Sequence, residues 1–232
     1  MENQKLSQSY KKCKQLIIDS LTNLDKLKEY KFNKNSFSFS KKKNNVTTLI
    51  YFTSNLSAEG EEFVLDLRGF YSIRYRSTYE WLRKYGNSIS DSYNIVDSFE
   101  DSLPKGSVRV YEQTQFDFKV ERDNLAMDFL KLSTFMETYV FPKVEACQNI
   151  EYYMANYVDS ALLRAGGNSG YVLFALLMTT KICTPEKLGF YIEVAKAKIA
   201  LYKLIGDFQV EEIYENRDRL FEELQKGVPP QK

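Results

Sequence analysis

The chain has 232 residues, of which 44% are apolar and 27% are charged, and this composition excludes a disordered, collagenous or disulfide-stapled protein. The 32 lysines and arginines almost balance the 31 aspartates and glutamates, so the net charge of +1 gives no global reason to expect a nucleic acid or an anionic membrane as partner. There is no histidine, which excludes Ser–His and Cys–His dyads and every histidine-containing metal site.

The cysteines Cys13, Cys147 and Cys183 are odd in number and far apart, which argues against a disulfide framework or a structural zinc site. We expect them to be small buried residues of a reduced protein. The N-terminus opens no signal-peptide pattern, and the longest apolar run, residues 171–178, is too short for a membrane span of about 20 residues. These features predict a cytoplasmic protein with no membrane contact.

The first predicted element is an amphipathic helix over about residues 4–29, because apolar residues recur there at intervals of three and four. Strand patterns follow at 36–40 and 46–54, separated by a polar turn at 41–45. The second strand is apolar on both faces, as expected of a strand that is covered on both sides.

Residues 56–60 resemble a loop, and residues 62–75 alternate as a strand that Gly69 interrupts, as at a β-bulge. Residues 77–106 have no clean period and predict a long connection. The clearest strand covers residues 108–120, where alternation places Phe116 and Phe118 on the core face. This alternation is typical of antiparallel sheets.

From residue 123 onward the apolar period changes to that of a helix. The first helix begins at Asp123 or Asn124 and is expected to stop at Pro142. Helices near 149–166 and 171–183 follow, the latter apolar on all sides and therefore buried. Thr184–Pro185 then opens a helix that ends at Gly206, and a last helix covers about 208–226.

The sequence therefore predicts one α+β domain over residues 1–232. Residues 1–122 supply a small antiparallel sheet of about four strands packed by the N-terminal helix, and residues 123–232 supply about five helices.

Several short segments resemble a known bacterial family. They are Tyr30-Lys31-Phe32, Phe37-Ser38-Phe39, the strand from Phe63 to Leu67, and the helix-to-proline break over 135–142. In this order they are similar to the family catalogued as domain of unknown function 4304, over roughly residues 5 to 160. Lys31 stands where the family usually has glycine. The resemblance implies an α+β fold and supplies no activity.

Arginines alternate with aromatic residues over residues 68–84, a combination that single-stranded nucleic-acid platforms use. The core requires most of these aromatic rings, which leaves mainly Arg74 and Arg76 on the outer face. With Arg109 and Lys119 on the polar face of the later strand, they form a possible partner-binding surface. The alternative is an ordinary solvated sheet face.

Asp66 and the triplet Asp117-Phe118-Lys119 are similar to the pattern of metal-dependent nucleases, in which two carboxylates hold Mg²⁺ and a lysine stabilises developing charge. Glu29-Tyr30-Lys31 matches the same triplet at a helix end, so the pattern is common. Convergence of Asp66 and Asp117 depends on a strand register that sequence alone leaves open. We therefore predict that Asp117 and Lys119 are surface residues. We also predict that the protein has no catalytic residue, no bound metal and no cofactor.

A glycine-rich segment at residues 166–170 lacks the preceding strand and the lysine of a phosphate-binding loop, so we interpret it as a helix connector. The preferred function is a non-catalytic cytoplasmic interaction or regulatory protein, with toxin neutralisation as one option and another protein as partner. The alternative is a nucleic-acid-associated protein that binds or cleaves. The oligomeric state stays open.

Overall fold

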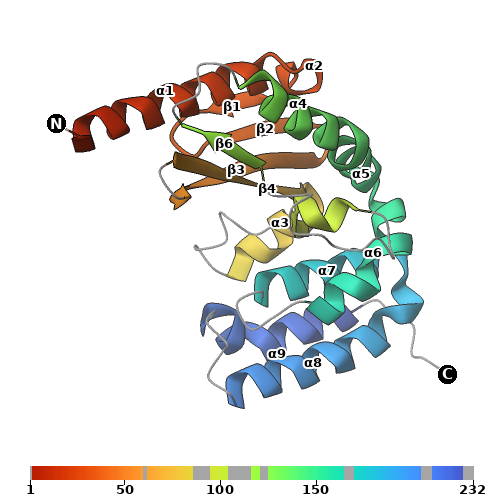
Figure 1. Ribbon diagram of the computed structural model, residues 1–232. Coiled ribbons are helices and arrows are strands. Elements are labelled where there is room, and N and C mark those ends of the chain that lie inside the picture. Colours follow the sequence, from red (N-terminus) through yellow and green to blue (C-terminus); the bar gives the residue numbers. More distant parts are fainter. Residues whose placement is uncertain are drawn as a thin grey trace. The chain divides into compact units, whose positions relative to one another are not determined.

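A computed structural model describes residues 2–59, 62–85, 95–103, 116–120, 125–164, 170–204 and 211–226. It confirms the α+β class, with an N-terminal helix, an antiparallel sheet and several C-terminal helices (Figure 1). The chain forms two compact units. The first unit comprises Met1–Lys42, Thr48–Ser72 and Val96–Glu145, and the second comprises Lys43–Thr47, Ile73–Ile95 and Ala146–Lys232. That residues 1–232 form one domain stays a prediction.

The N-terminal helix is divided into α1 (Glu2–Thr22) and α2 (Asp25–Lys28), so the single helix expected over 4–29 was wrong. Leu24 adopts an extended conformation with φ −64° and ψ 128° just before α2. The break follows Thr22 and Asn23, which have modest helix propensity. Leu21 and Leu27, on either side of the break, are both buried.

The described residues contain six strands in one sheet. They are β1 (Lys31–Asn33), β2 (Ser38–Lys43), β3 (Val46–Glu59), β4 (Glu62–Tyr75), β5 (Ile95–Ser98) and β6 (Phe116–Lys119). Their order is β1-β2-β3-β4-β5, and β6 also pairs with β4. Because a strand has only two edges, β5 and β6 share the edge of β4 that β3 leaves open.

Two strand boundaries differ from the sequence-based expectation. β2 continues through Lys43, so the turn shortens to Asn44 and Asn45, with Asn44 in the left-handed region at φ 53°. Asparagine tolerates this conformation, and two-residue hairpin turns require it. β3 continues to Glu59, so the predicted loop was wrong over residues 56–59, and Gly60 lies outside the described residues.

The predicted long connection contains α3 (Arg76–Leu82), the 3₁₀ turns η1 (Arg83–Tyr85) and η3 (Phe99–Ser102), and β5. In β6 the alternation is confirmed, because Phe116 and Phe118 are buried while Asp117 is exposed. The earlier part of that predicted strand, residues 108–115, lies outside the described residues.

The core of the first unit is a series of phenylalanine contacts. Ring centroids are 5.2 Å apart for Phe37–Phe52, 5.6 Å for Phe52–Phe99, 6.4 Å for Phe99–Phe135 and 5.6 Å for Phe116–Phe135. These rings come from β3, β6, the chain preceding β2, η3 and the helix α4 (Ala126–Phe135). The series therefore joins the sheet to α4.

We had expected the helix that begins with α4 to stop at Pro142, but it continues beyond this residue. It passes through a π-helical segment, η5 (Met136–Val140), into α5 (Phe141–Cys147). The wider π turn already interrupts the regular hydrogen-bond pattern just before Pro142. The missing N–H of proline is therefore less costly there than inside a regular α-helix.

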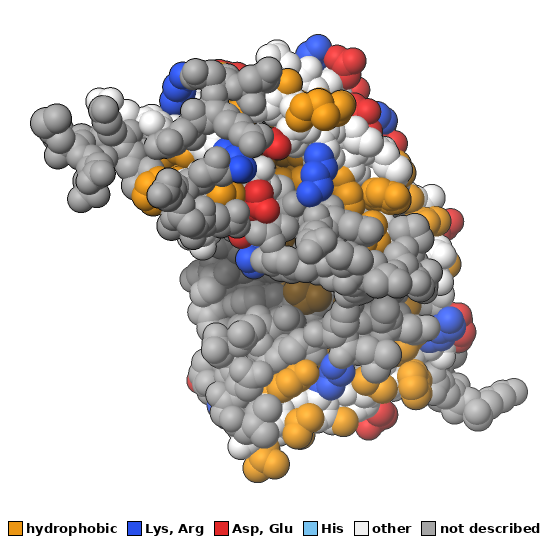
Figure 2. Space-filling model, viewed as in Figure 1, with side chains coloured by type: hydrophobic (Ala, Val, Ile, Leu, Met, Phe, Trp, Pro, Cys, Tyr) orange, Lys and Arg blue, Asp and Glu red, His pale blue; other side chains and the backbone are white. Residues whose placement is uncertain are grey.

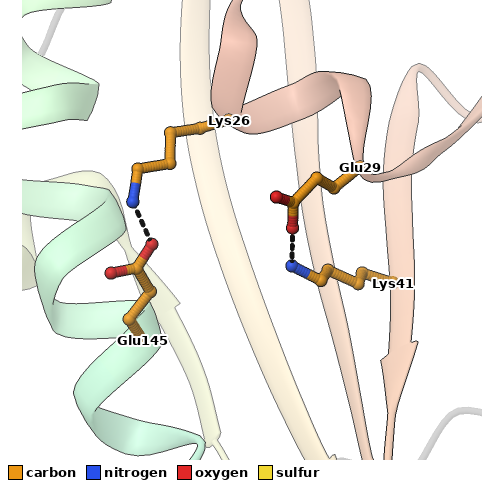
Figure 3. A network of polar contacts seen from close by, with 4 residues as sticks. All are labelled: Lys26, Glu29, Lys41 and Glu145. Atoms are coloured by element: carbon orange, nitrogen blue, oxygen red, sulfur yellow. Dashed lines mark hydrogen bonds and ion pairs between the residues drawn. The ribbon is translucent and has the colours of Figure 1, made fainter.

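Two ion pairs fasten α2 within the first unit (Figure 3). The Lys26 ammonium donates to the Glu145 carboxylate on α5 at 2.5 Å. Lys41 on β2 pairs with Glu29, the residue that ends α2. These pairs connect α2 and the residue that ends it to α5 and to β2.

The second unit is built around α7 (Gly170–Cys183), whose central residues Leu173 to Leu177 are all buried. It packs against α3, α6 (Ile150–Arg164), α8 (Leu188–Leu204) and α9 (Glu211–Gln225), and η7 (Pro185–Lys187) precedes α8. The predicted burial of this helix is thus confirmed for its central residues, whereas Ile182 near its end is exposed. Within the described part of the chain, no helix has both the length and the apolar character needed to span a membrane.

The end of α9 is held by a lysine from α7. The Lys181 ammonium donates to the carbonyl oxygens of Glu223 and Lys226, both at 2.8 Å. The last carbonyls of a helix lack partners within the helix and carry partial negative charge, so a cation is favourable there.

Candidate functional site

The strand pair β4–β6 brings together the two aspartates singled out from the sequence. The pairing is antiparallel, and Asp66 is the direct partner of Asp117. Directly paired residues project to the same face, with Cβ atoms about 4.5–5.5 Å apart. The register that sequence alone left open therefore places both carboxylates on one face.

The two carboxylates have different surroundings. Asp66 is buried, and its Oδ2 accepts a hydrogen bond from Arg68 Nε at 3.1 Å. Its Oδ1 has no hydrogen-bond partner within the described structure. Asp117 is exposed, and Lys119 lies two residues along the same face, opposite Val64. This arrangement places two carboxylates and two cationic side chains on neighbouring strands.

A magnesium ion in proteins commonly uses one or two carboxylates together with water and phosphate oxygens. Asp66 and Asp117 are the residues here that could supply them. Among the described residues, no three aspartate, glutamate, cysteine or histidine side chains gather closely enough to hold a metal ion. Arg68 already compensates the charge of Asp66, so a metal ion would compete with its guanidinium.

The other described residues of the predicted partner-binding surface belong to a different unit. Arg74 and Arg76 belong to the second unit, whereas Lys119 belongs to the first. The guanidinium of Arg74 lies 4.3 Å from the ring centroid of Tyr79, and Arg76 Nε donates to Glu80 Oε1 at 2.6 Å. Arg109 lies outside the described residues. The described cations of the predicted surface are therefore divided between the two units.

An apolar groove on α4, which we call the α4 groove, was not predicted. Its volume is about 510 Å³, and its described lining comprises Leu103, Met127, Leu130, Lys131, Thr134, Phe135, Thr138 and Tyr139. All of these residues belong to the first unit. Met127 is 77% exposed and Leu130 is 56% exposed. Hydrophobic side chains are visible over this part of the surface in Figure 2.

The groove has an exposed apolar rim and a packed floor. Phe135 belongs to the aromatic core, and its ring centroid lies 5.1 Å from that of Tyr139. Tyr139 follows α4 inside the π-helical segment η5, and such segments occur frequently at functional sites. The core therefore fixes the floor, whereas Met127 and Leu130 at the rim are exposed, and an unbranched methionine side chain adapts readily to a ligand.

Sequence reasoning missed the groove because it assigned α4 only an inward apolar stripe. The stripe residues Leu132 and Phe135 are indeed buried. Met127 and Leu130 are apolar but fall outside that stripe. Two long apolar residues on the outer face of an amphipathic helix were the signal that could have identified it.

The three cysteines differ in how deeply they are buried. Cys13 and Cys147 are buried, as expected, whereas Cys183 is half-buried. Burial raises the pKa of the Cys13 thiol to about 11, and the neighbouring Asp128 carboxylate adds to the shift. The Cys13 thiol is therefore protonated at neutral pH and is a poor nucleophile.

Comparisons of the chain with protein families, with curated proteins and with solved structures find no match. The resemblance to domain of unknown function 4304 stays a prediction.

Proposed function

We propose that this chain is a non-catalytic interaction protein that binds another protein through the α4 groove. The observation that carries the proposal is the exposure of Met127 and Leu130 beside a packed aromatic floor. Scattered exposed apolar residues are ordinary, but long apolar side chains that line a groove are typical of a docking surface. We place this activity in the cytoplasm, and toxin neutralisation is one form that it could take.

The lining chemistry indicates the kind of partner. Leu103, Met127 and Leu130 offer an apolar slot for one anchoring side chain. Lys131 adds a positive charge at the same slot, while Thr134 supplies a hydroxyl group. These features fit a peptide segment that presents an apolar anchor next to an acidic residue, because the two contacts reinforce one another.

The test is affinity capture with tagged wild-type protein and the variants Leu130→Lys and Met127→Lys, followed by identification of bound proteins and nucleic acids. A matched control is Ile182→Lys, because Ile182 is also an exposed apolar residue but lies on α7. We expect one protein partner to be retained by the wild type and the control and lost by both groove variants. Retention by both groove variants, or capture of nucleic acid alone, contradicts the proposal.

A second candidate is the nucleic-acid-associated alternative, and the pairing of Asp66 with Asp117 is the observation in its favour. The test is incubation with single- and double-stranded DNA and RNA in Mg²⁺ or Mn²⁺, beside Asp117→Ala. We expect no cleavage, because Arg68 already occupies one carboxylate. Cleavage that Asp117→Ala abolishes would place this candidate first. Binding without cleavage that Arg74→Ala and Arg76→Ala weaken would support a nucleic-acid-binding protein.

A further inference from the structure

Helix α8 carries a second apolar stripe, distinct from the face that packs in the second unit. The stripe consists of Phe190, Val194, Ala197, Leu201 and Leu204, spaced alternately by four and three residues. Phe190 is 66% exposed, Leu201 53% and Leu204 84%. Figure 2 shows hydrophobic side chains along α8 at the lower edge of the view.

The core of the second unit does not need this stripe. The buried residues of α8 lie on another face and are Leu188, Tyr191, Ile192, Ala195 and Ile199. The helix is therefore apolar on two sides, and one of them meets solvent. Alternating steps of four and three residues form a heptad repeat, which is the pattern of a seam between two helices.

The charges beside the stripe favour a particular partner. With Val194 and Leu201 at the a positions, Glu193 occupies a g position and Lys198 an e position. In a parallel pair of helices, a g residue lies beside the e residue five places later on the other helix. Glu193 and Lys198 are five residues apart, so two copies of α8 would form this opposite-charge pair twice.

An antiparallel pair would not use the same charges. There the g positions of the two helices face one another. The g positions within the stripe are Glu193 and Ala200, which carry no opposite charges. In the single chain Glu193 pairs with Lys196 at 2.8 Å on the exposed surface. Such a pair contributes about 0–1 kcal/mol, so exchanging it for Lys198 of a second copy is inexpensive.

We propose that α8 pairs in parallel with α8 of a second copy of this chain, with the apolar stripe as the seam and Glu193–Lys198 pairs at its edges. The stripe covers two heptads, a length of about 22 Å at 1.5 Å per residue. A contact of this size forms a weak, concentration-dependent dimer. The proposal uses a different surface from the α4 groove and does not depend on it.

The first test measures mass in solution by sedimentation equilibrium over a wide range of concentrations. We expect a reversible dimer for the wild type, and a dissociation constant raised about tenfold or more by Leu201→Lys and by Leu204→Lys. Met127→Lys on α4 is the matched control and should leave the dimer unchanged. A wild type that stays monomeric at every concentration, or a dimer that both α8 variants retain, overturns the proposal.

The second test establishes direction. In a parallel pair residue 201 faces its own counterpart, so Leu201→Cys in a Cys183→Ser background should form a disulfide-linked dimer on mild oxidation. Lys196→Cys, on the exposed surface beside the stripe, should not. We also expect Glu193→Lys to weaken the dimer and the double variant Glu193→Lys, Lys198→Glu to restore it. Absence of both the link at residue 201 and the charge rescue excludes the parallel pair.

Discussion

The ring of Phe99 lies where a side chain on Gly69 would have to be. A Cβ atom built on Gly69 would come within 2.3 Å of Cε2 of Phe99. Phe99 is buried and also contacts Phe52 edge-on at 5.6 Å, so its ring has little freedom to withdraw. β4 runs through Gly69 from Glu62 to Tyr75. Close approach of an aromatic ring, rather than a turn, therefore explains the glycine.

This relationship predicts that Gly69→Ala destabilises the protein by roughly 1–3 kcal/mol, the usual cost of overpacking. The double variant Gly69→Ala, Phe99→Ala should cost less than the sum of the single changes, because removing the ring relieves the clash. Urea unfolding of the wild type, both single variants and the double variant measures this coupling. Strict additivity would show that Phe99 is not the cause.

Phe118 should be among the most costly residues to truncate. It is fully buried on β6 and pairs directly with Leu65 of β4. Phe118→Ala should lower the free energy of unfolding by roughly 3–5 kcal/mol through lost burial and the cavity left behind. The neighbouring Asp117 is exposed, so Asp117→Ala should change stability by no more than about 0.5 kcal/mol. Equal melting temperatures for the two variants would contradict the assigned faces.

Lys181 should stabilise the end of α9. Replacing it by methionine removes both hydrogen bonds from its ammonium to the terminal carbonyls of the helix. We expect a loss of about 1–2 kcal/mol, because hydrogen bonds to a charged group contribute more than neutral ones but this group is partly exposed. Lys28→Met, which breaks only an exposed pair with Asp25, is the control. Faster amide exchange near residues 223–226 in Lys181→Met alone is the second measurement.

Stability should fall at high pH. Burial raises the pKa of Tyr30 to about 12, and the carboxylates of Glu145 and Glu29 add to the shift. Between the ordinary tyrosine pKa of about 10 and this value, the unfolded chain loses a proton that the folded chain keeps, so unfolding becomes more favourable as pH rises.

For Tyr30 alone the decline is up to about 1.4 kcal/mol per pH unit within that range. Chemical unfolding between about pH 9 and pH 12, a range that includes both pKa values, measures this decline. Tyr30→Phe cannot ionise and should show a shallower decline. Parallel curves for Tyr30→Phe and the wild type would mean that Tyr30 ionises equally in both states.

The features predicted correctly from the sequence are those that local periodicity determines. Alternation identified Phe116 and Phe118 as core residues, and an apolar surface on all sides identified α7 as buried. The α+β class followed from the order of such segments. In each case the buried face of an element can be read from the spacing of apolar residues within that element alone.

The features that could not be predicted depend on distant parts of the chain. Pro142 appeared to end a helix, but the π turn before it allows the helix to continue. The pairing of Asp66 with Asp117 is a register between strands, and β4 could have met β6 in several registers with the same alternation. The α4 groove combines Leu103 with a helix that begins more than twenty residues later.

The π-helical segment also sets how this protein could change its length over evolution. A π turn holds one residue more than an α turn, because its hydrogen bonds join residues five apart rather than four. Deleting one residue within Met136–Val140 would therefore restore an unbroken α-helix and leave α4 facing nearly the same way relative to α5. In the regular α-helix on either side each residue advances the chain by about 100° around the axis, so a deletion there would carry the residues beyond it off their buried face. A change of length by one residue should therefore be tolerated within the π-helical segment and selected against in α4 and α5.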